Sequence, residues 1–90
     1  MNLQSLRKRI DRLDLQLLRL LNQRAALAVR VGQIKRRHGQ PVFDKRREAE
    51  VLRRLSRANP GPFPSAAIRR MFRDILRQSR KLEATKSQRT

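Results

Sequence analysis

The sequence contains no cysteine, no tyrosine and no tryptophan, and its one histidine is His38. Without cysteine there is neither a disulfide framework nor thiol chemistry, and a single histidine excludes a histidine-rich metal site. The three phenylalanines fall where turns and core would place them, so the aromatic platforms on which nucleic-acid bases stack are missing. These absences argue against a metal enzyme and against a protein that binds bases by stacking.

Acidic residues and long apolar runs are also scarce. The chain has 7 Asp and Glu against 24 Lys and Arg, a net charge of +17. Such a field attracts nucleic acid, acidic membranes and small polyanions alike, but the cations are spread over the whole chain, which weakens the nucleic-acid interpretation. The N-terminus lacks the apolar core of a signal peptide, and no run approaches the roughly 20 residues of a membrane span. We therefore expect a cytoplasmic protein without membrane contact.

Leu3–Arg37 contains no proline and one glycine, Gly32. Its apolar residues follow a spacing of three and four, which predicts one long helix with a single buried stripe. At about 1.5 Å per residue this helix would be about 52 Å long, whereas a compact domain of this size has a radius of gyration of about 12 Å. A single chain near the lower size limit for an independent core cannot cover the stripe, so we expect a dimer.

A stop signal follows the first helix. Gly39 and Pro41 come directly after its last turn, a combination that is typical of helix ends. A second helix is predicted from about Asp44 to Arg57, with Asp44 as its N-cap, because a carboxylate accepts hydrogen bonds from the exposed amides of a first turn.

The sequence NPGPFP at residues 59–64 predicts a rigid turn, in which prolines forbid a helix and Gly61 allows a positive φ. Ser65 is then the predicted N-cap of a third helix that runs to about Ala84. We expect the polar residues 85–90 to fray. The fold class is therefore all-α, with three helices in one domain.

Two cations interrupt the apolar stripe of the first helix. Arg24 and Lys35 are eleven residues apart, which places them within about 20° of the same helix face. Long cationic side chains often extend past the edge of a core into solvent, which would explain either residue alone. For both residues on one face, a buried anion is a competing explanation.

The other two predicted helices also carry polar residues on their apolar sides, Asp44 and Glu48 on the second, Ser79 and Glu83 on the third. Three of them have a structural explanation: Asp44 is a cap, Glu48 pairs with a neighbouring arginine, and a buried serine such as Ser79 bonds to a carbonyl one turn earlier. The functional interpretation is that polar residues from all three helices surround one pocket inside a helical bundle.

Four segments of the sequence resemble the all-helical class of chorismate mutase, and together they extend from Leu3 to Glu83. They are LRKRIDRLDLQLLRLLNQR, AVRVGQIK, PVFDKRREAEVL and IRRMFRDILRQSRKLE. The resemblance implies a chorismate mutase domain over residues 1–84, in an intertwined homodimer whose long first helices pair. It further implies an isomerase of aromatic amino-acid biosynthesis that rearranges chorismate to prephenate without a cofactor or a covalent intermediate.

The resemblance also assigns roles to the polar residues. Arg24 and the partner subunit's Arg7 would bind the substrate carboxylates, because a guanidinium matches a carboxylate bidentately. Within one chain the two positions lie seventeen residues apart, about 25 Å along one helix, too far to share a site. Lys35 would donate to the ether oxygen of the substrate, whose negative charge grows as the bond breaks.

The remaining assignments come from the second and third helices. Asp44 and Glu48 would orient the ring hydroxyl and the lysine side of the pocket, Arg47 would support a carboxylate, and Ser79 would bond to one. Glu83 departs from the pattern, because many members carry glutamine there as a second donor to the ether oxygen. An ionised carboxylate has no proton to donate, so this role requires the protonated acid. Turnover should then fall as pH rises, and Glu83→Gln should flatten the profile.

Other interpretations of the sequence stay open. A small basic nucleic-acid-binding dimer predicts binding that weakens steeply with salt and is indifferent to Lys35→Ala beyond one lost charge. A regulatory dimer without activity, or lysis of isochorismate in the same pocket, would also suit the fold. The NPGPFP turn resembles chorismate mutases associated with the first enzyme of the shikimate pathway. The charge of +17 would help to attract a dianion and exceeds that need, so an acidic partner or incidental arginine enrichment both stand as explanations.

Overall fold

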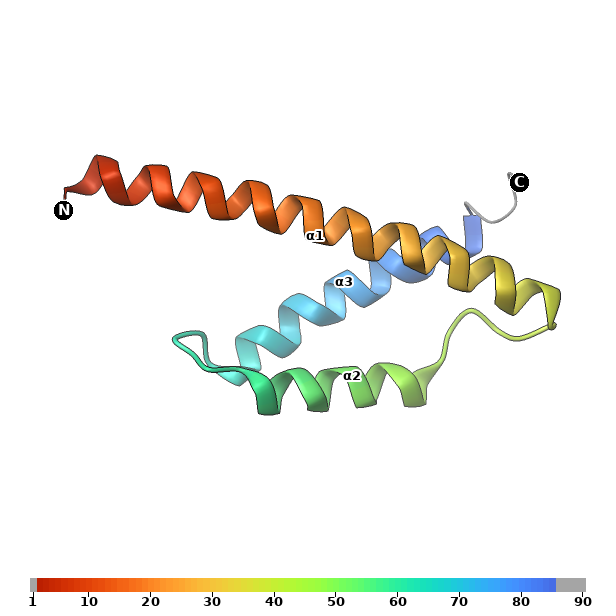
Figure 1. The fold of residues 1–90 in the computed structure, drawn as a ribbon. Coiled ribbons are helices and arrows are strands. Elements are labelled where there is room, and N and C mark those ends of the chain that lie inside the picture. Colours follow the sequence, from red (N-terminus) through yellow and green to blue (C-terminus); the bar gives the residue numbers. More distant parts are fainter. Residues whose placement is uncertain (1, 86–90) are drawn as a thin grey trace.

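The computed structural model of the chain describes residues 2–85 and consists of three helices (Figure 1): α1 (Leu3–Arg37), α2 (Lys45–Ala58) and α3 (Ser65–Thr85). No strand occurs within these residues, so the all-α, three-helix prediction is confirmed. Of the predicted frayed tail, residues 85–90, Thr85 is the last residue of α3, and residues 86–90 lie outside the described part.

α1 has the bounds that the sequence predicted, and both of its ends are set by local residues. Asn2 is the N-cap, and its Oδ1 accepts a hydrogen bond from the amide of Ser5 at 2.8 Å. The last turn contains three basic residues, Lys35, Arg36 and Arg37, which complement the negative end of the helix dipole. Gly39 follows with a φ of 64°, the left-handed conformation that reverses the chain after a helix.

α2 begins after the predicted cap. Oδ1 of Asp44 accepts a hydrogen bond from the amide of Arg47 at 3.0 Å, and the helix ends one residue beyond its predicted end. In the turn that follows, Asn59 braces the backbone at both sides: its Oδ1 accepts from Gly61 N at 3.1 Å, and its Nδ2 donates to Phe63 O at 2.7 Å. Gly61 has the predicted positive φ, 78°.

The prediction of Ser65 as the N-cap of α3 is wrong. Ser65 is already helical, and its hydroxyl donates to the carbonyl of Ser56 at 3.4 Å instead of accepting from its own helix. The first acceptor of α3 is the carbonyl of Pro64, which receives the amide of Ile68 at 3.2 Å. The helix therefore starts one residue earlier than a serine cap would place it.

α3 packs against both other helices. It runs antiparallel to α2, forming a hairpin with it, and crosses behind α1 (Figure 1). Within residues 2–85, α1 and α2 do not pack directly on each other. Gly32 is buried at the crossing of α1 and α3, where an added Cβ would lie 2.6 Å from the carbonyl oxygen of Glu83. The absence of a side chain at Gly32 thus brings Glu83 against α1.

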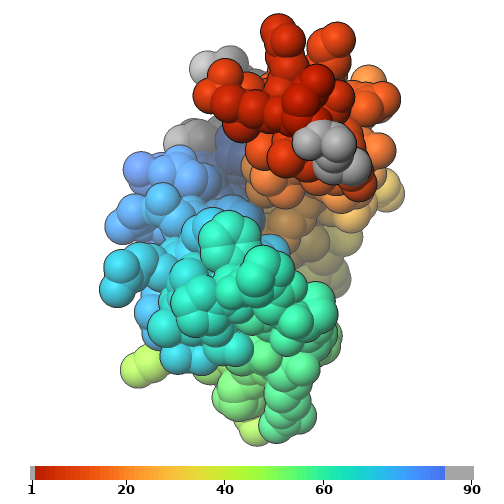
Figure 2. Space-filling model, turned by 90° about the vertical axis from the view of Figure 1, so that its left-hand side faces the viewer, coloured from red at the N-terminus to blue at the C-terminus, as the bar shows by residue number. Residues whose placement is uncertain are grey.

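The apolar stripe of α1 is largely uncovered in a single chain. The described core contains three buried apolar residues, Ala28, Val51 and Leu76, whereas Leu13 and Leu20 are each 61% exposed. The N-terminal turns of α1 stand above the turn that joins α2 and α3, as Figure 2 shows end-on. In residues 2–85, α1 and the other helices are each too short or too polar to cross a bilayer. The exposed apolar stripe of α1 forms a surface of the kind that marks an interaction site.

Candidate active site

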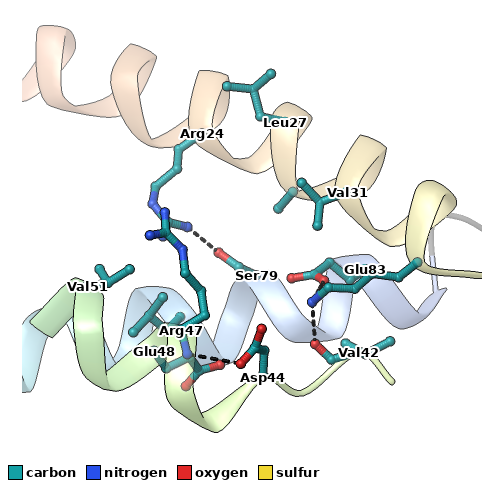
Figure 3. A pocket seen from close by; sticks show the side chains of 13 residues that line it. Arg24, Leu27, Val31, Val42, Asp44, Arg47, Glu48, Val51, Ser79 and Glu83 are labelled. Carbon is teal, nitrogen blue, oxygen red and sulfur yellow. Dashed lines mark hydrogen bonds and ion pairs between the residues drawn. The ribbon is translucent and has the colours of Figure 1, made fainter. Parts of the chain in front are cut away.

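A pocket of about 300 Å³ lies between α1, α2 and α3 (Figure 3). Its polar lining consists of Arg24, Lys35, Asp44, Arg47, Glu48, Ser79 and Glu83. Its apolar lining consists of Leu27, Ala28, Val31, Val42, Val51 and Leu76. Seven of the eight site residues predicted from the sequence therefore meet in one cavity. The structure brings together the polar residues of all three helices because their apolar neighbours pack around them.

One end of the pocket is formed by Arg24 and Ser79. Nη1 of Arg24 donates to the hydroxyl of Ser79 at 2.9 Å, and that hydroxyl donates to the carbonyl of Ile75 at 2.8 Å. The bond of Ser79 to a carbonyl one turn earlier was the structural explanation for this residue, and it is present. The second bond, however, also directs the guanidinium of Arg24 into the pocket. Among residues 2–85, Arg24 forms no ion pair with a carboxylate, so its charge is available to an anionic ligand.

The other end of the pocket is formed by Lys35 and Glu83. Nζ of Lys35 donates to the carbonyl of Val42 at 2.8 Å and to Oε1 of Glu83 at 3.1 Å. Both charged side chains are mostly buried, with 18% and 11% of their surfaces exposed. An ammonium group has three N–H donors, so the geometry leaves one for an oxygen atom of a ligand. Because the protein acceptors fix the lysine head, that donor is pre-oriented.

Glu48 is held by an arginine that the sequence analysis did not identify. Its Oε1 and Oε2 accept from Nη1 of Arg80 at 2.5 and 2.6 Å, and the same guanidinium stacks on the ring of Phe43, 4.6 Å from its centroid. The prediction that Glu48 pairs with a neighbouring arginine was therefore wrong, because its partner comes from α3. A signal was present, since Arg80 follows the buried Leu76 by four residues and so lies near the packed side of α3.

Arg47 rises from α2 into the same cavity into which Arg24 descends from α1 (Figure 3). Its Nη1 also donates to Oε1 of Glu50 at 2.7 Å, in a pair that is more than half exposed and therefore weak. Of the two arginines, Arg24 has no carboxylate partner within residues 2–85, so it gives this end of the pocket a positive charge that a ligand can meet. The opposite end is balanced by the Lys35–Glu83 pair. The arrangement suits a ligand with a carboxylate at one end and a neutral or developing oxygen anion at the other.

Arg7 is the one predicted site residue that lies outside the pocket. It sits on an early turn of α1 and is exposed. Because α1 is continuous between Arg7 and Arg24, the two residues are about 25 Å apart along the helix axis. The side chain of Arg7 therefore cannot reach the pocket of its own chain.

Residues 6–84 match the family model of chorismate mutase type II. The chain is 41% identical over 85 residues to the bifunctional chorismate mutase/prephenate dehydratase of Aquifex aeolicus, and 40% identical over 70 residues to the protein of the same name from Neisseria gonorrhoeae. These matches cover 90% and 78% of this chain but 24% and 19% of the relatives, so the chain spans about a quarter of their length or less. The form II structure of chorismate mutase from Thermus thermophilus superposes with a TM-score of 0.90 at 41% identity, covering 91% of this chain and 93% of that one.

Proposed function

The chain belongs to the chorismate mutase type II family, and on this premise we propose that it rearranges chorismate to prephenate in the pocket between its three helices. The reaction is intramolecular, so the protein needs to supply only binding and electrostatics. It must hold the substrate dianion in its folded conformer and stabilise the charge that grows on the ether oxygen. Neither task requires a cofactor.

Substrate binding is assigned to the positive end of the pocket. Arg24, whose Nη1 donates to the hydroxyl of Ser79 at 2.9 Å, binds one carboxylate of the substrate. The hydroxyl of Ser79 bonds to the same carboxylate. Arg47 adds a second cation from α2. Asp44 and Glu48 orient the ring hydroxyl of the substrate and the lysine side of the pocket, which fixes the direction in which the ring lies. Apolar residues of the pocket wall exclude water around it.

The chemical step is assigned to the Lys35 end. Its ammonium group donates to the ether oxygen, and this bond strengthens in the transition state as negative charge develops there. Glu83 supplies a second donor when it is protonated, which is the state in which a carboxyl group can donate. The observation that carries the proposal is the placement of the buried Lys35–Glu83 pair opposite the Arg24–Ser79 pair in one pocket.

The working unit of this proposal is a homodimer. The uncovered stripe of α1 is the surface that a second copy would bury, and a 35-residue helix is expected to gain most of its stability from such packing. Antiparallel pairing of two long helices places the partner subunit's Arg7 at the mouth of the pocket, where it completes the carboxylate site. The cytoplasmic location and an association with the first enzyme of the shikimate pathway are further parts of the proposal. Their support is the sequence alone.

The proposal is tested by following the loss of chorismate absorbance with the purified chain at several pH values between about 5 and 8. Wild type should form prephenate, and Lys35→Ala should lose that activity. Lys45→Ala removes one positive charge from the exposed start of α2 and should retain the activity. Absence of turnover in the wild type, or equal loss in both variants, would refute the assignment. Isochorismate, a similar dianion, is measured in parallel, because the same pocket would accept it.

A further inference from the structure

A second groove lies on the outer side of the α2–α3 hairpin. It has a volume of about 450 Å³, and four arginines line it: Arg53, Arg57, Arg69 and Arg73. None of its lining residues belongs to the pocket described above. Arg53 follows the pocket residue Val51 by two positions, about 200° around the helix, so groove and pocket lie on opposite sides of α2. We call this surface the arginine groove.

The four arginines are divided equally between the two helices of the hairpin. Each helix contributes two of them one turn apart, Arg53 and Arg57 on α2, Arg69 and Arg73 on α3. The hairpin is antiparallel, and Nη1 of Arg69 donates to the hydroxyl of Ser56 at 3.3 Å, which holds Arg69 against α2. Arginines of both helices therefore border the same groove. Positive charges one helical turn apart, about 5 to 6 Å, line both walls.

These charges are not neutralised by the described part of the chain. Within residues 2–85, none of the four arginines forms an ion pair with a carboxylate. On the same helices, Arg54 pairs with Glu50 and Arg77 with Asp74. Glu50 and Asp74 are thus paired with arginines that do not line the groove, and the four groove arginines, which carry like charge, repel one another. An anion bound between them would relieve that repulsion.

The other lining residues of the groove distinguish between kinds of anion. They are Ala49, Leu52 and the hydroxyl-bearing Ser56, all on α2, so an apolar strip lies beside the arginines. Among the lining residues there is no aromatic side chain on which a base could stack. An amphipathic segment with an apolar edge and flanking carboxylates matches both features. In such a helix, acidic residues four positions apart are separated by the same one-turn distance as the arginines.

We propose that the arginine groove binds an acidic amphipathic helix of a partner protein. Carboxylates of the helix pair with the groove arginines, and an apolar side chain between them packs on Ala49 and Leu52. The buried area is small, so the complex is of the transient class, and its affinity falls as salt rises. This role gives part of the large net positive charge a purpose apart from attracting a small substrate, and it does not depend on the proposed catalytic function.

The test uses the full 90-residue chain and a fluorescein-labelled helical peptide with leucine every turn and glutamates four residues apart. Fluorescence anisotropy is measured at low salt, where charge contacts are least screened. Arg53→Gln/Arg73→Gln removes one groove arginine from each helix and should weaken binding about tenfold, as expected for two lost charge-assisted contacts. The control, Arg46→Gln/Arg70→Gln, removes the same charge from the same two helices outside the groove. It should change binding less than about twofold.

Three outcomes would refute the proposal. If both double variants weaken binding equally, net charge alone attracts the peptide. If a peptide with glutamine in place of glutamate binds equally well, the arginines do not recognise carboxylates. If a DNA duplex binds more tightly than the peptide and is equally sensitive to Arg53→Gln/Arg73→Gln, the groove serves nucleic acid. Circular dichroism and chorismate turnover of both variants should equal those of the wild type, which shows that the altered binding does not come from a change of fold.

Discussion

Replacing Arg80 by methionine should impair the site without touching the pocket lining. Like arginine, methionine has an unbranched side chain and favours helices, but it lacks the guanidinium that holds Glu48. Nη1 of Arg80 lies 2.5 and 2.6 Å from the two carboxylate oxygens, and the side chains are 30% and 20% exposed. Glu48 would then be free to adopt other rotamers and to draw a cation away from the substrate.

The size of the effect follows from these contacts. Hydrogen bonds to charged groups contribute about 1.5 to 3 kcal/mol when largely buried. Partial exposure of this pair reduces that figure, and the stacking of Arg80 on Phe43 adds about 0.5 to 1 kcal/mol. We expect Arg80→Met to lower the free energy of unfolding by about 2 kcal/mol. A similar loss of transition-state binding would lower kcat/KM by about 10 to 30-fold.

The assay is a double-mutant cycle of chorismate turnover. If Arg80 acts through Glu48, Arg80→Met should reduce kcat/KM strongly in the wild type but less than about threefold in a Glu48→Gln background, because there is no carboxylate left to position. Arg77→Met is the matched control: it removes an exposed arginine that pairs with Asp74 on the same helix, and should leave kcat/KM nearly unchanged. Equal losses in both backgrounds, or an unaltered kcat/KM in Arg80→Met, would refute the reasoning.

Three further predictions concern the helix crossing, the acid and the subunit interface. Gly32→Ala places a Cβ 2.6 Å from the carbonyl oxygen of Glu83, and should lower the urea midpoint by the equivalent of about 1 to 3 kcal/mol, although alanine favours helix; an unchanged midpoint at equal protein concentration would show that the crossing adjusts freely. Glu83→Gln should keep or raise turnover, since an amide carries its own hydrogen-bond donor; a large loss of turnover in this variant excludes Glu83 as a donor to the ether oxygen. Arg7→Gln and Arg24→Gln should each lose most activity, whereas mixing the two should restore about a quarter of it through heterodimers with one intact site. A mixture as inactive as its components would contradict a site shared between subunits.

Much of this architecture is readable from the sequence because the signals are local. Asp44 precedes its helix as a cap, Gly39 follows the end of α1, and polar residues such as Lys35 at apolar positions reveal the pocket. The features that escaped prediction depend on how helices meet. The partner of Glu48 is Arg80 because of the antiparallel register of α2 and α3, which no local pattern specifies.

The same distinction explains two smaller differences. Gly32 is visible in the sequence as the one glycine of the long helix, but only the packed structure identifies the backbone of α3 as the group that needs the space. Serine is a common N-cap residue, but the hydroxyl of Ser65 donates instead to the carbonyl of Ser56 in the preceding helix. Residue type thus predicts what a side chain is able to do, and the tertiary contacts select which of its options is used.

The lack of direct packing between α1 and α2 has a mechanical consequence. In the described chain α1 and α2 each pack on α3, and the space between them is the pocket. Arg24 and Lys35 belong to α1, and Arg47 and Glu48 belong to α2. A ligand held by residues of both helices would link two helices that do not pack on each other. Occupancy would then stiffen the fold as a whole, and a ligand at a hundred times its Kd would add about 2.7 kcal/mol to the free energy of unfolding.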